Sequence, residues 1–252
     1  MKFLGIIPAR YASTRFPGKP LVDIGGKSMI QRVYEQVSLC LDEVWVATDD
    51  LRIKEAVDAF GGRCMMTSDQ HKSGTDRCLE VVNKLNTTFD VVINIQGDEP
   101  FIQPAQIELL KNCFVQYPQT QIATLVKPFS KTDEWATLSN PNSPKVVLNS
   151  SMEALYFSRS VIPYLRNEPK ENWLNVHTFY KHIGLYAYLP KTLSEIAALP
   201  MSTLEKSESL EQLRWLENGY KIQTAVTNIE NLAVDTPEDL ALVRQFFMQN
   251  NV

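Results

Sequence analysis

The chain has 252 residues, of which 44% are hydrophobic and 21% are charged, and its formal net charge at pH 7 is -4. A chain of this size can bury a hydrophobic core without help from disulfides. The acidic balance argues against general nucleic-acid binding, because counterion release requires a basic face. Its four cysteines form no CxxC pair, and the apolar residues at the amino terminus are too few for a secretory signal or a membrane span. We therefore expect a cytoplasmic protein that binds neither nucleic acid nor membrane.

The first strand-like segment, residues 3–7, runs directly into a loop that contains three cations. Arg10, Arg15 and Lys19 are separated there by prolines, which restrict the backbone, and by small residues, which let a ligand approach it. An open α/β sheet binds ligands at the carboxyl ends of its strands, so this loop predicts a site for a phosphate-bearing ligand. Three solvated surface charges are the alternative.

The following hundred residues alternate between helical and strand-like patterns of apolar side chains. Helices are expected over residues 28–41, 51–60, 76–85 and 104–116. Strands are expected over residues 43–48, 63–67, 90–96 and 121–126. Alternation of this kind is typical of a largely parallel sheet with helices on both faces.

The alternation breaks between about residues 128 and 190, where prolines punctuate the chain. Three segments look like strands without helices between them, namely residues 146–148, 154–157 and 183–188. We interpret this stretch as a β-rich subdomain within a single domain that spans residues 1–252. Such an element can close a ligand pocket, and its apolar strands also suit a dimer contact.

Two further helices, over residues 203–218 and 237–250, are expected to return the chain to the main part of the domain. The second has a strong start signal. Thr236 occupies the N-cap, Pro237 follows as the first helical residue, and an acid stands at the third position.

Two carboxylates are placed where a metal could bind. Asp98 follows the strand over residues 90–96, and Asp235 lies directly before the last helix, so we expect both to face the cationic loop. Taken singly, Asp98 could be a turn residue and Asp235 a partner of the helix dipole. Carboxylates nevertheless suit Mg²⁺, which takes one or two of them and completes its shell with water and substrate phosphates. Together with the loop, they predict a site for Mg²⁺ and a triphosphate.

Seven segments of the chain together resemble the 3-deoxy-manno-octulosonate cytidylyltransferases. They follow in the family's order along nearly the whole chain: residues 7–20, 47–50, 73–77, 94–100, 154–159, 210–214 and 234–239. The resemblance implies a Rossmann-like nucleotidyltransferase fold of the glycosyltransferase-A type, α/β, with a mixed, mainly parallel sheet and a small β-rich insertion. It also implies a homodimeric enzyme that transfers CMP from CTP to the anomeric hydroxyl of the acid sugar Kdo. The products would be CMP-Kdo, used in lipopolysaccharide biosynthesis, and pyrophosphate.

The same resemblance implies roles for individual residues. Three cations, Arg10, Arg15 and Lys19, would bind the triphosphate and act as catalytic residues. Asp98 would be a further catalytic residue. The ligands of the Mg²⁺ cofactor would be Asp98 and Asp235, and the nucleotide site would also include Ala9, Arg77 and Gln96. The segments of the family that line the sugar pocket contain Arg159, His182, Tyr186, Glu211 and Gln212. An arginine there is a natural partner for the Kdo carboxylate, because a guanidinium binds it bidentately.

Three alternatives differ in substrate or in class. A cytidylyltransferase for another acid sugar, such as a sialic acid, would share the phosphate and metal loops, but residues 210–214 favour Kdo. A metal-dependent glycosyltransferase usually carries Asp-x-Asp, and here Pro100 occupies the third position of that motif. A non-catalytic nucleotide- or sugar-binding module would tolerate loss of an acid or of the lysine, whereas all of them are present.

Overall fold

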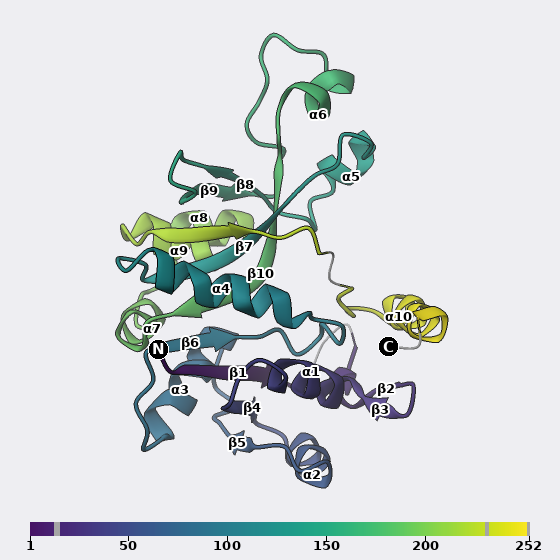
Figure 1. Cartoon of the computed structure of the whole chain (residues 1–252), viewed down its shortest axis with the longest axis vertical. Helices are drawn as coiled ribbons and strands as arrows, with labels where there is room; N and C mark the ends of the chain where they lie inside the picture. Colours follow the sequence, from purple (N-terminus) through teal and green to yellow (C-terminus); the bar gives the residue numbers. More distant parts are fainter. Residues whose placement is uncertain (13–15, 230–231, 251–252) are drawn as a thin grey trace. The chain divides into compact units, whose positions relative to one another are not determined.

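The computed structural model describes residues 1–12, 16–229 and 232–250. The chain divides into two compact units, each of which is described by itself below (Figure 1). Unit 1 consists of Met1–Glu108, Leu189–Ala197 and Glu230–Val252, and unit 2 consists of Leu109–Tyr188 and Ala198–Ile229. Within the described ranges, no helix has the length and apolar character needed to cross a membrane.

The sheet of unit 1 is parallel. Its central strand β1 (Phe3–Ala9) pairs with β6 (Val91–Asn94) on one side and with β4 (Val44–Thr48) on the other, and β4 pairs with β5 (Cys64–Met66). Helices pack against β1, and its residues Leu4, Ile6 and Ile7 have no exposed surface. Burial on both faces explains why these strands are almost continuous apolar runs. The predicted parallel α/β arrangement is therefore confirmed.

Side-chain caps set the starts of three helices of unit 1. Each cap accepts a hydrogen bond from a backbone N–H of the first turn, which would otherwise lack a partner within the helix. The helices are α1 (Met29–Ser38), α2 (Leu51–Ala59) and α3 (Gly74–Lys84), and their caps are Ser28, Asp50 and Ser73. Unit 1 also contains α7 (Pro190–Ala197) and α10 (Pro237–Asn250), and α4 (Pro104–Gln116) leads from unit 1 into unit 2.

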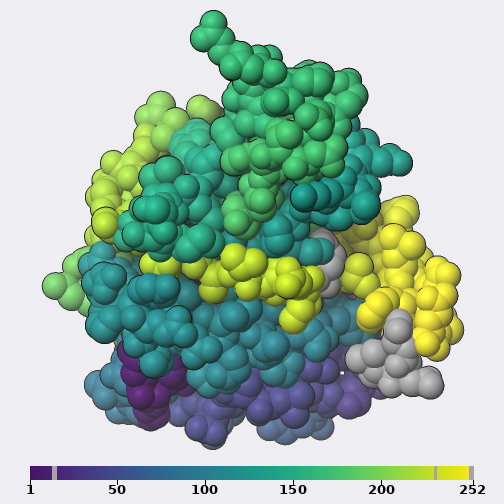
Figure 2. All heavy atoms as spheres, turned by 45° about the horizontal axis from the view of Figure 1, so that its top comes forward, coloured from purple at the N-terminus to yellow at the C-terminus, as the bar shows by residue number. Residues whose placement is uncertain are grey.

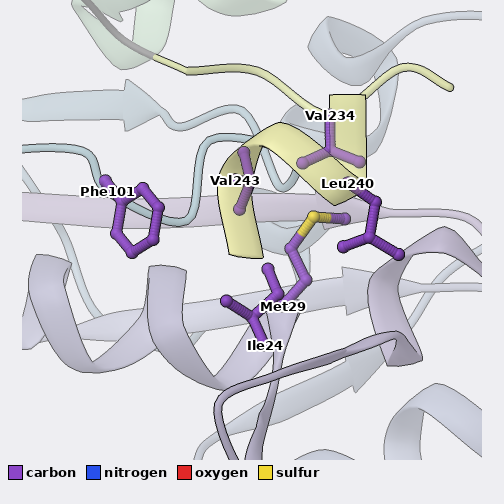
Figure 3. Packing of buried hydrophobic residues seen from close by; sticks show 6 residues of the cluster. All are labelled: Ile24, Met29, Phe101, Val234, Leu240 and Val243. Carbon is purple, nitrogen blue, oxygen red and sulfur yellow. The ribbon is translucent and has the colours of Figure 1, made fainter. Parts of the chain in front are cut away.

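A short hairpin, β2 (Asp23–Ile24) and β3 (Lys27–Ser28), supports α10. A Cβ atom on Gly25, in the turn of this hairpin, would lie 2.0 Å from the ring of Phe247, so only glycine fits there. Buried apolar side chains fill the space between α10, the start of α1 and the loop after β6 (Figure 3). They are Ile24, Met29, Phe101, Val234, Leu240 and Val243.

The strands of unit 2 form a mixed arrangement. They are β7 (Ile122–Pro128), β8 (Lys145–Leu148), β9 (Ala154–Ser158), β10 (Tyr180–Tyr188) and β11 (Ile222–Val226). β7 pairs in parallel with β11 and antiparallel with β10, while β8 pairs antiparallel with both β10 and β9. This unit contains most of the stretch that the sequence marks as β-rich, and all three strands predicted there are present.

The expectation that no helices interrupt this β-rich stretch is wrong. Two short α-helices, α5 (Trp135–Ser139) and α6 (Trp173–Val176), and a 3-10 helix over Lys170–Asn172 lie within it. Both α-helices contribute to a buried apolar cluster, in which Trp173 is 2% exposed and its ring stacks on Phe179 with centroids 5.9 Å apart. Helices of one turn are too short for a periodic apolar pattern to reveal them.

The expected helix over residues 203–218 is two helices, α8 (Thr203–Glu208) and α9 (Gln212–Glu217). Ser209, directly after α8, has φ 51 and so lies in the left-handed region. The carboxylate of Glu208 accepts hydrogen bonds from Ser158 Oγ at 2.6 Å and from Arg159 N at 2.9 Å. These distant partners hold the end of α8 and break the helix, which a local pattern cannot show.

Candidate active site

Lys19 lies between the two carboxylates for which the sequence predicts metal binding. Its Nζ is 2.7 Å from Asp98 Oδ2 and 3.2 Å from Asp235 Oδ1. The side chain of Lys19 is 15% exposed, whereas those of Asp98 and Asp235 are 27% and 43% exposed. The structure thus brings together three of the predicted residues at one part-buried place that remains open to solvent.

Local backbone contacts explain why these groups converge. Lys19 begins a 3-10 helix over Lys19–Leu21, directly after the loop that follows β1. Asp98 follows Gly97, where a Cβ atom would lie 2.9 Å from the carbonyl oxygen of Pro8, so glycine lets the loop after β6 approach the end of β1. The carbonyl oxygen of Asp98 accepts a hydrogen bond from the N–H of Val234 at 2.9 Å. That bond places the residue before Asp235 beside Asp98.

The donor set of this cluster fits Mg²⁺ bound together with a nucleotide. In the part of the chain that the structure describes, no group of three or more His, Cys, Asp or Glu side chains could hold a metal ion. Asp98 and Asp235 nevertheless supply two hard carboxylates, and the ammonium group of Lys19 shows that their oxygens converge on a single positive charge. Since Mg²⁺ usually takes one or two carboxylates and fills its shell with phosphate oxygens and water, two acids are sufficient.

Arg10 joins the loop after β1 to a second loop of unit 1. Its Nη2 donates to the backbone carbonyl oxygens of His71, at 2.6 Å, and Asp69, at 3.4 Å. Its Nε lies 3.8 Å from a carboxylate oxygen of Asp49, and the side chain is 44% exposed. Arg10 therefore keeps an exposed guanidinium near the carboxyl end of β1. Arg15 lies outside the described residues.

Arg77 lies in the interior of unit 1, with 1% of its surface exposed. Its Nη2 donates to Asp49 Oδ2 at 2.8 Å, and its Nη1 donates to Thr67 Oγ1 at 2.5 Å. Asp49 is thus close to both Arg10 and Arg77. No sequence pattern predicts these two contacts. Ala9 is 4% exposed at the end of β1, and Gln96 is half-buried just after β6.

In unit 2, several of the predicted sugar-pocket residues lie together. His182 and Tyr186 are both on β10, with ring centroids 5.3 Å apart, and Trp215 of α9 meets Tyr186 edge to face at 5.1 Å. The hydroxyl of Tyr186 and the amide nitrogen of Gln212 are buried and have no hydrogen-bond partner among the described residues. Buried polar atoms are normally paired, so each of these two atoms has capacity for a further hydrogen bond.

The other two predicted sugar-pocket residues have partners within unit 2. Glu211 Oε1 accepts a hydrogen bond from Arg214 Nη2 at 2.7 Å. The guanidinium of Arg159 donates to three backbone carbonyl oxygens, those of Glu208 at 2.6 Å, Pro141 at 2.9 Å and Ser209 at 3.3 Å. A guanidinium has five N–H groups, so these contacts fix Arg159 and leave it capacity for an anionic ligand. Its role as partner of the Kdo carboxylate stays a prediction.

Burial determines the protonation of two of these side chains. It lowers the pKa of His182 from its usual value of 6.5 to about 3, so the ring is neutral at neutral pH, and Nε2 lies 3.1 Å from Thr124 Oγ1. Burial also raises the pKa of Tyr186, with a smaller contribution from the charge of Glu211, so the phenol keeps its proton. Tyr186 is therefore a neutral hydrogen-bond donor. Thr124 belongs to the apolar strand β7, and no sequence pattern marks it as part of this site.

The lowered pKa of His182 predicts that the stability of the protein depends on pH. Its folded pKa lies below the unfolded value, so its contribution is complete above about pH 6.5 and is lost progressively as the pH falls toward 3. Between pH 7 and pH 5, the wild-type protein should lose about 2 kcal/mol more unfolding free energy than the His182→Gln variant. Urea unfolding at both pH values measures the difference. Equal losses in the two proteins would show that His182 is not neutral in the folded state.

Comparison with known proteins identifies the family of the chain. The cytidylyltransferase family matches residues 4–222 of the chain. Proteins named 3-deoxy-manno-octulosonate cytidylyltransferase from Bacteroides thetaiotaomicron and Escherichia coli are 64% and 46% identical to it. The first alignment covers 98% of this chain and 98% of the relative, and the second covers 97% and 95%.

Solved structures are similar to the chain as well. That of CMP:2-keto-3-deoxy-manno-octonic acid synthetase complexed with CTP matches with a TM-score of 0.90 and 45% identity, covering 99% of each chain. The 4-diphosphocytidyl-2C-methyl-D-erythritol synthase from Anaerococcus prevotii is only 14% identical, with a TM-score of 0.60, over 98% of this chain and 96% of that one, and shares the fold alone. The chain therefore belongs to the cytidylyltransferase family, among its 3-deoxy-manno-octulosonate cytidylyltransferases.

Proposed function

We propose that the enzyme transfers CMP from CTP to the anomeric hydroxyl of 3-deoxy-manno-octulosonate (Kdo), forming CMP-Kdo for lipopolysaccharide biosynthesis and releasing pyrophosphate. The observation that carries this proposal is the convergence of Asp98 and Asp235 on Lys19. Nucleotidyl transfer depends mainly on positioning and charge stabilisation, and this cluster supplies both signs of charge at one place. The names of the close relatives and the CTP complex of the related structure support the choice of substrates.

The reaction needs charge stabilisation where the triphosphate is cleaved. The anomeric hydroxyl oxygen attacks the α-phosphorus and gives up its proton to water, the bond from this phosphorus to the bridging oxygen breaks, and pyrophosphate leaves with the electron pair. Arg10, Arg15 and Lys19 bind the phosphates in this proposal and stabilise the negative charge that moves onto the leaving group. Asp98 and Asp235 would hold Mg²⁺, which when bound lowers the pKa of the sugar hydroxyl and neutralises charge at the α-phosphate.

The other nucleotide contacts follow from the end of the parallel sheet in unit 1. Ala9 and Gln96 stand at or just beyond the carboxyl ends of β1 and β6, where a ligand approaches an open α/β sheet. Arg77 is buried against Asp49, and we assign it to the cytidine side of the nucleotide site. Because Asp49 already holds the guanidinium in place, Arg77 loses little conformational entropy when a ligand binds.

The sugar pocket in this proposal uses the polar side chains of unit 2. The hydroxyl of Tyr186 and the amide of Gln212 would pair with hydroxyl groups of Kdo, and Glu211 would accept from others. His182 is neutral and bonded to Thr124, so it acts as a fixed polar neighbour rather than as a base. Arg159 would bind the carboxylate of the sugar.

Tyr186→Phe separates binding from folding. Because the hydroxyl has no partner among the described residues, its removal should leave the unfolding free energy unchanged or raise it by up to about 1 kcal/mol. The KM for Kdo should rise roughly 10-fold, the effect of one lost hydrogen bond, while the KM for CTP stays unchanged. Steady-state kinetics with each substrate varied in turn, together with urea unfolding, measures both effects.

Tyr180→Phe provides a matched control, because Tyr180 is half-buried at the other end of the same strand. Both Michaelis constants of this variant should stay close to those of the wild type. An unchanged KM for Kdo in Tyr186→Phe would remove Tyr186 from the sugar pocket.

Pyrophosphate release tests the reaction and the acceptor together. We expect release from CTP that depends on Kdo and on Mg²⁺, and only weak release with a sialic acid. A sugar-nucleotide donor should give no glycosyl transfer. Release that prefers a sialic acid would favour the other acid-sugar activity, and CTP binding without any turnover would favour a non-catalytic module.

We further propose that the enzyme is a cytoplasmic homodimer. All four cysteines are free thiols, which suits a reducing compartment. Unit 2 exposes large apolar side chains, among them Leu155, Tyr164 and Val176 at 58%, 71% and 52%, and such surfaces favour contact with a second copy.

A further inference from the structure

We propose that Asp239, in the first turn of α10, is a positioning residue that orients Asp235 toward Lys19 and Asp98. This inference rests on the proposed role of Asp235 as a metal ligand. The carboxylate oxygen Oδ2 of Asp239 accepts hydrogen bonds from the backbone N–H groups of Asp235, at 3.0 Å, and Thr236, at 2.9 Å. In return, the N–H of Asp239 donates to Thr236 Oγ1 at 3.2 Å. The side chain that completes the cap of α10 thus also holds the backbone of Asp235.

The residue on the other side of Asp235 is fixed as well. Val234 has no exposed surface and packs in the apolar cluster with Met29 and Leu240 (Figure 3). Its N–H donates to the carbonyl oxygen of Asp98 at 2.9 Å. The backbone of Asp235 therefore lies between two anchors, and its carboxylate, 43% exposed, meets the ammonium group of Lys19 at 3.2 Å.

The helix that carries Asp239 is itself held in unit 1. Leu240 and Val243 are buried in the same cluster, at 6% and 1% exposure. On another side, the guanidinium of Arg244 donates two hydrogen bonds to the carbonyl oxygen of Asp23, at 2.9 Å and 2.7 Å, and the ring of Phe247 packs on Gly25. The outer side of α10 is exposed (yellow in Figure 2), as Leu242 at 62% illustrates. Asp239 is therefore a fixed point rather than part of a mobile end.

A fixed partner matters because a carboxylate binds a cation well only when it is oriented before the cation arrives. Loss of a group that orients a metal ligand typically lowers metal affinity about 10- to 100-fold. Asp239 binds no cation itself in this proposal, and its oxygen Oδ2 accepts the two backbone N–H groups. Its effect on the metal passes through Asp235.

The test compares two variants that break the same cap from opposite sides. Asp239→Ala removes both bonds made by the carboxylate, including the one to Asp235. Thr236→Ala removes the return bond from Asp239 N and leaves the contact between Asp239 and Asp235 in place. Both should lower the melting temperature to a similar extent, because each loses part of the helix cap. Electron paramagnetic resonance with Mn²⁺ as probe, in the presence of CTP, measures metal binding without turnover.

We expect Asp239→Ala to bind Mn²⁺ about 10- to 100-fold more weakly than the wild type, and Thr236→Ala to bind it normally. Asp239→Asn should restore most of the affinity, because an amide oxygen accepts the same two hydrogen bonds. Normal Mn²⁺ affinity in Asp239→Ala, or equal losses in the two alanine variants, would overturn the positioning role.

Two further measurements distinguish failure of the positioning role of Asp239 from failure of the proposed metal site. If Asp235→Asn binds Mn²⁺ normally, the assignment of Asp235 as a metal ligand fails; if it binds weakly while Asp239→Ala binds normally, only the positioning role fails. Should Asp239→Ala not fold, hydrogen exchange of the wild-type protein decides. The amide of Asp235 should be protected from exchange, and rapid exchange there would overturn the inference.

Discussion

Asp98→Asn is expected to abolish CMP transfer and to leave the fold intact. The substitution keeps the shape of the side chain and removes the negative charge that lies 2.7 Å from Lys19. The backbone contact between Asp98 O and Val234 N does not depend on the side chain, so the loop should keep its path. In the proposed reaction, the metal loses one of its two protein ligands, and kcat should fall by roughly 1,000-fold or more. Pyrophosphate release and circular dichroism measure the two effects.

Asp90→Asn is the matched control, because Asp90 stands just before β6 whereas Asp98 follows it. The side chain of Asp90 accepts a hydrogen bond from the N–H of Lys2 at 2.6 Å, away from the carboxyl end of the sheet. This variant should turn over at close to the wild-type rate. Normal turnover by Asp98→Asn, or full activity of the wild type in excess EDTA, would contradict the metal assignment.

Lys19→Ala is expected to lower kcat by roughly 100- to 1,000-fold, the typical effect of losing one preorganised electrostatic group. The ammonium group would stabilise charge on the phosphates as the α-phosphorus is attacked, so the loss should appear in kcat more than in the KM for Kdo. Steady-state kinetics at saturating Mg²⁺ measures it. Without Lys19, Asp98 and Asp235 lose a shared counter-ion, so Mn²⁺ binding measured without CTP should not weaken.

Lys27→Ala serves as the control for this variant. Lys27 lies in the β2–β3 hairpin of the same unit and pairs with Glu35 at 2.6 Å, where both side chains are exposed. An exposed pair of this kind contributes little, so kcat should not change. A kcat near the wild-type value in Lys19→Ala would show that the lysine only bridges the two carboxylates and plays no part in the reaction.

The fold could be predicted where a local signal sets the element. Pro104 and the residues Thr236 and Pro237 mark the starts of α4 and α10, and both helices have the predicted bounds. The β2–β3 hairpin has two residues per strand, too few for any periodic pattern, and α7 and β11 were not predicted either. The break between α8 and α9 depends on Ser158, which lies 50 residues from its partner Glu208. A contact over such a distance leaves no local trace.

The candidate site could be predicted in position but not in detail. The carboxyl ends of parallel strands meet at one edge of a sheet, and this rule alone places Asp98 near the loop after β1. That Lys19 also reaches Asp235, 216 residues away, depends on α10 and its apolar cluster, and no sequence pattern specifies the rotamer of a lysine. The pairing of Arg77 with Asp49 could not be predicted either, because the packing of unit 1 brings their two segments together.

A crystal structure of the enzyme with CTP and Mg²⁺ tests the central claim most directly. We predict an ion bound by one carboxylate oxygen of Asp98 and one of Asp235, each at about 2.0 to 2.1 Å, with triphosphate oxygens in the same shell. The ammonium group of Lys19 should contact a phosphate. An ion held by the nucleotide alone, or a triphosphate bound away from Lys19, would contradict the account.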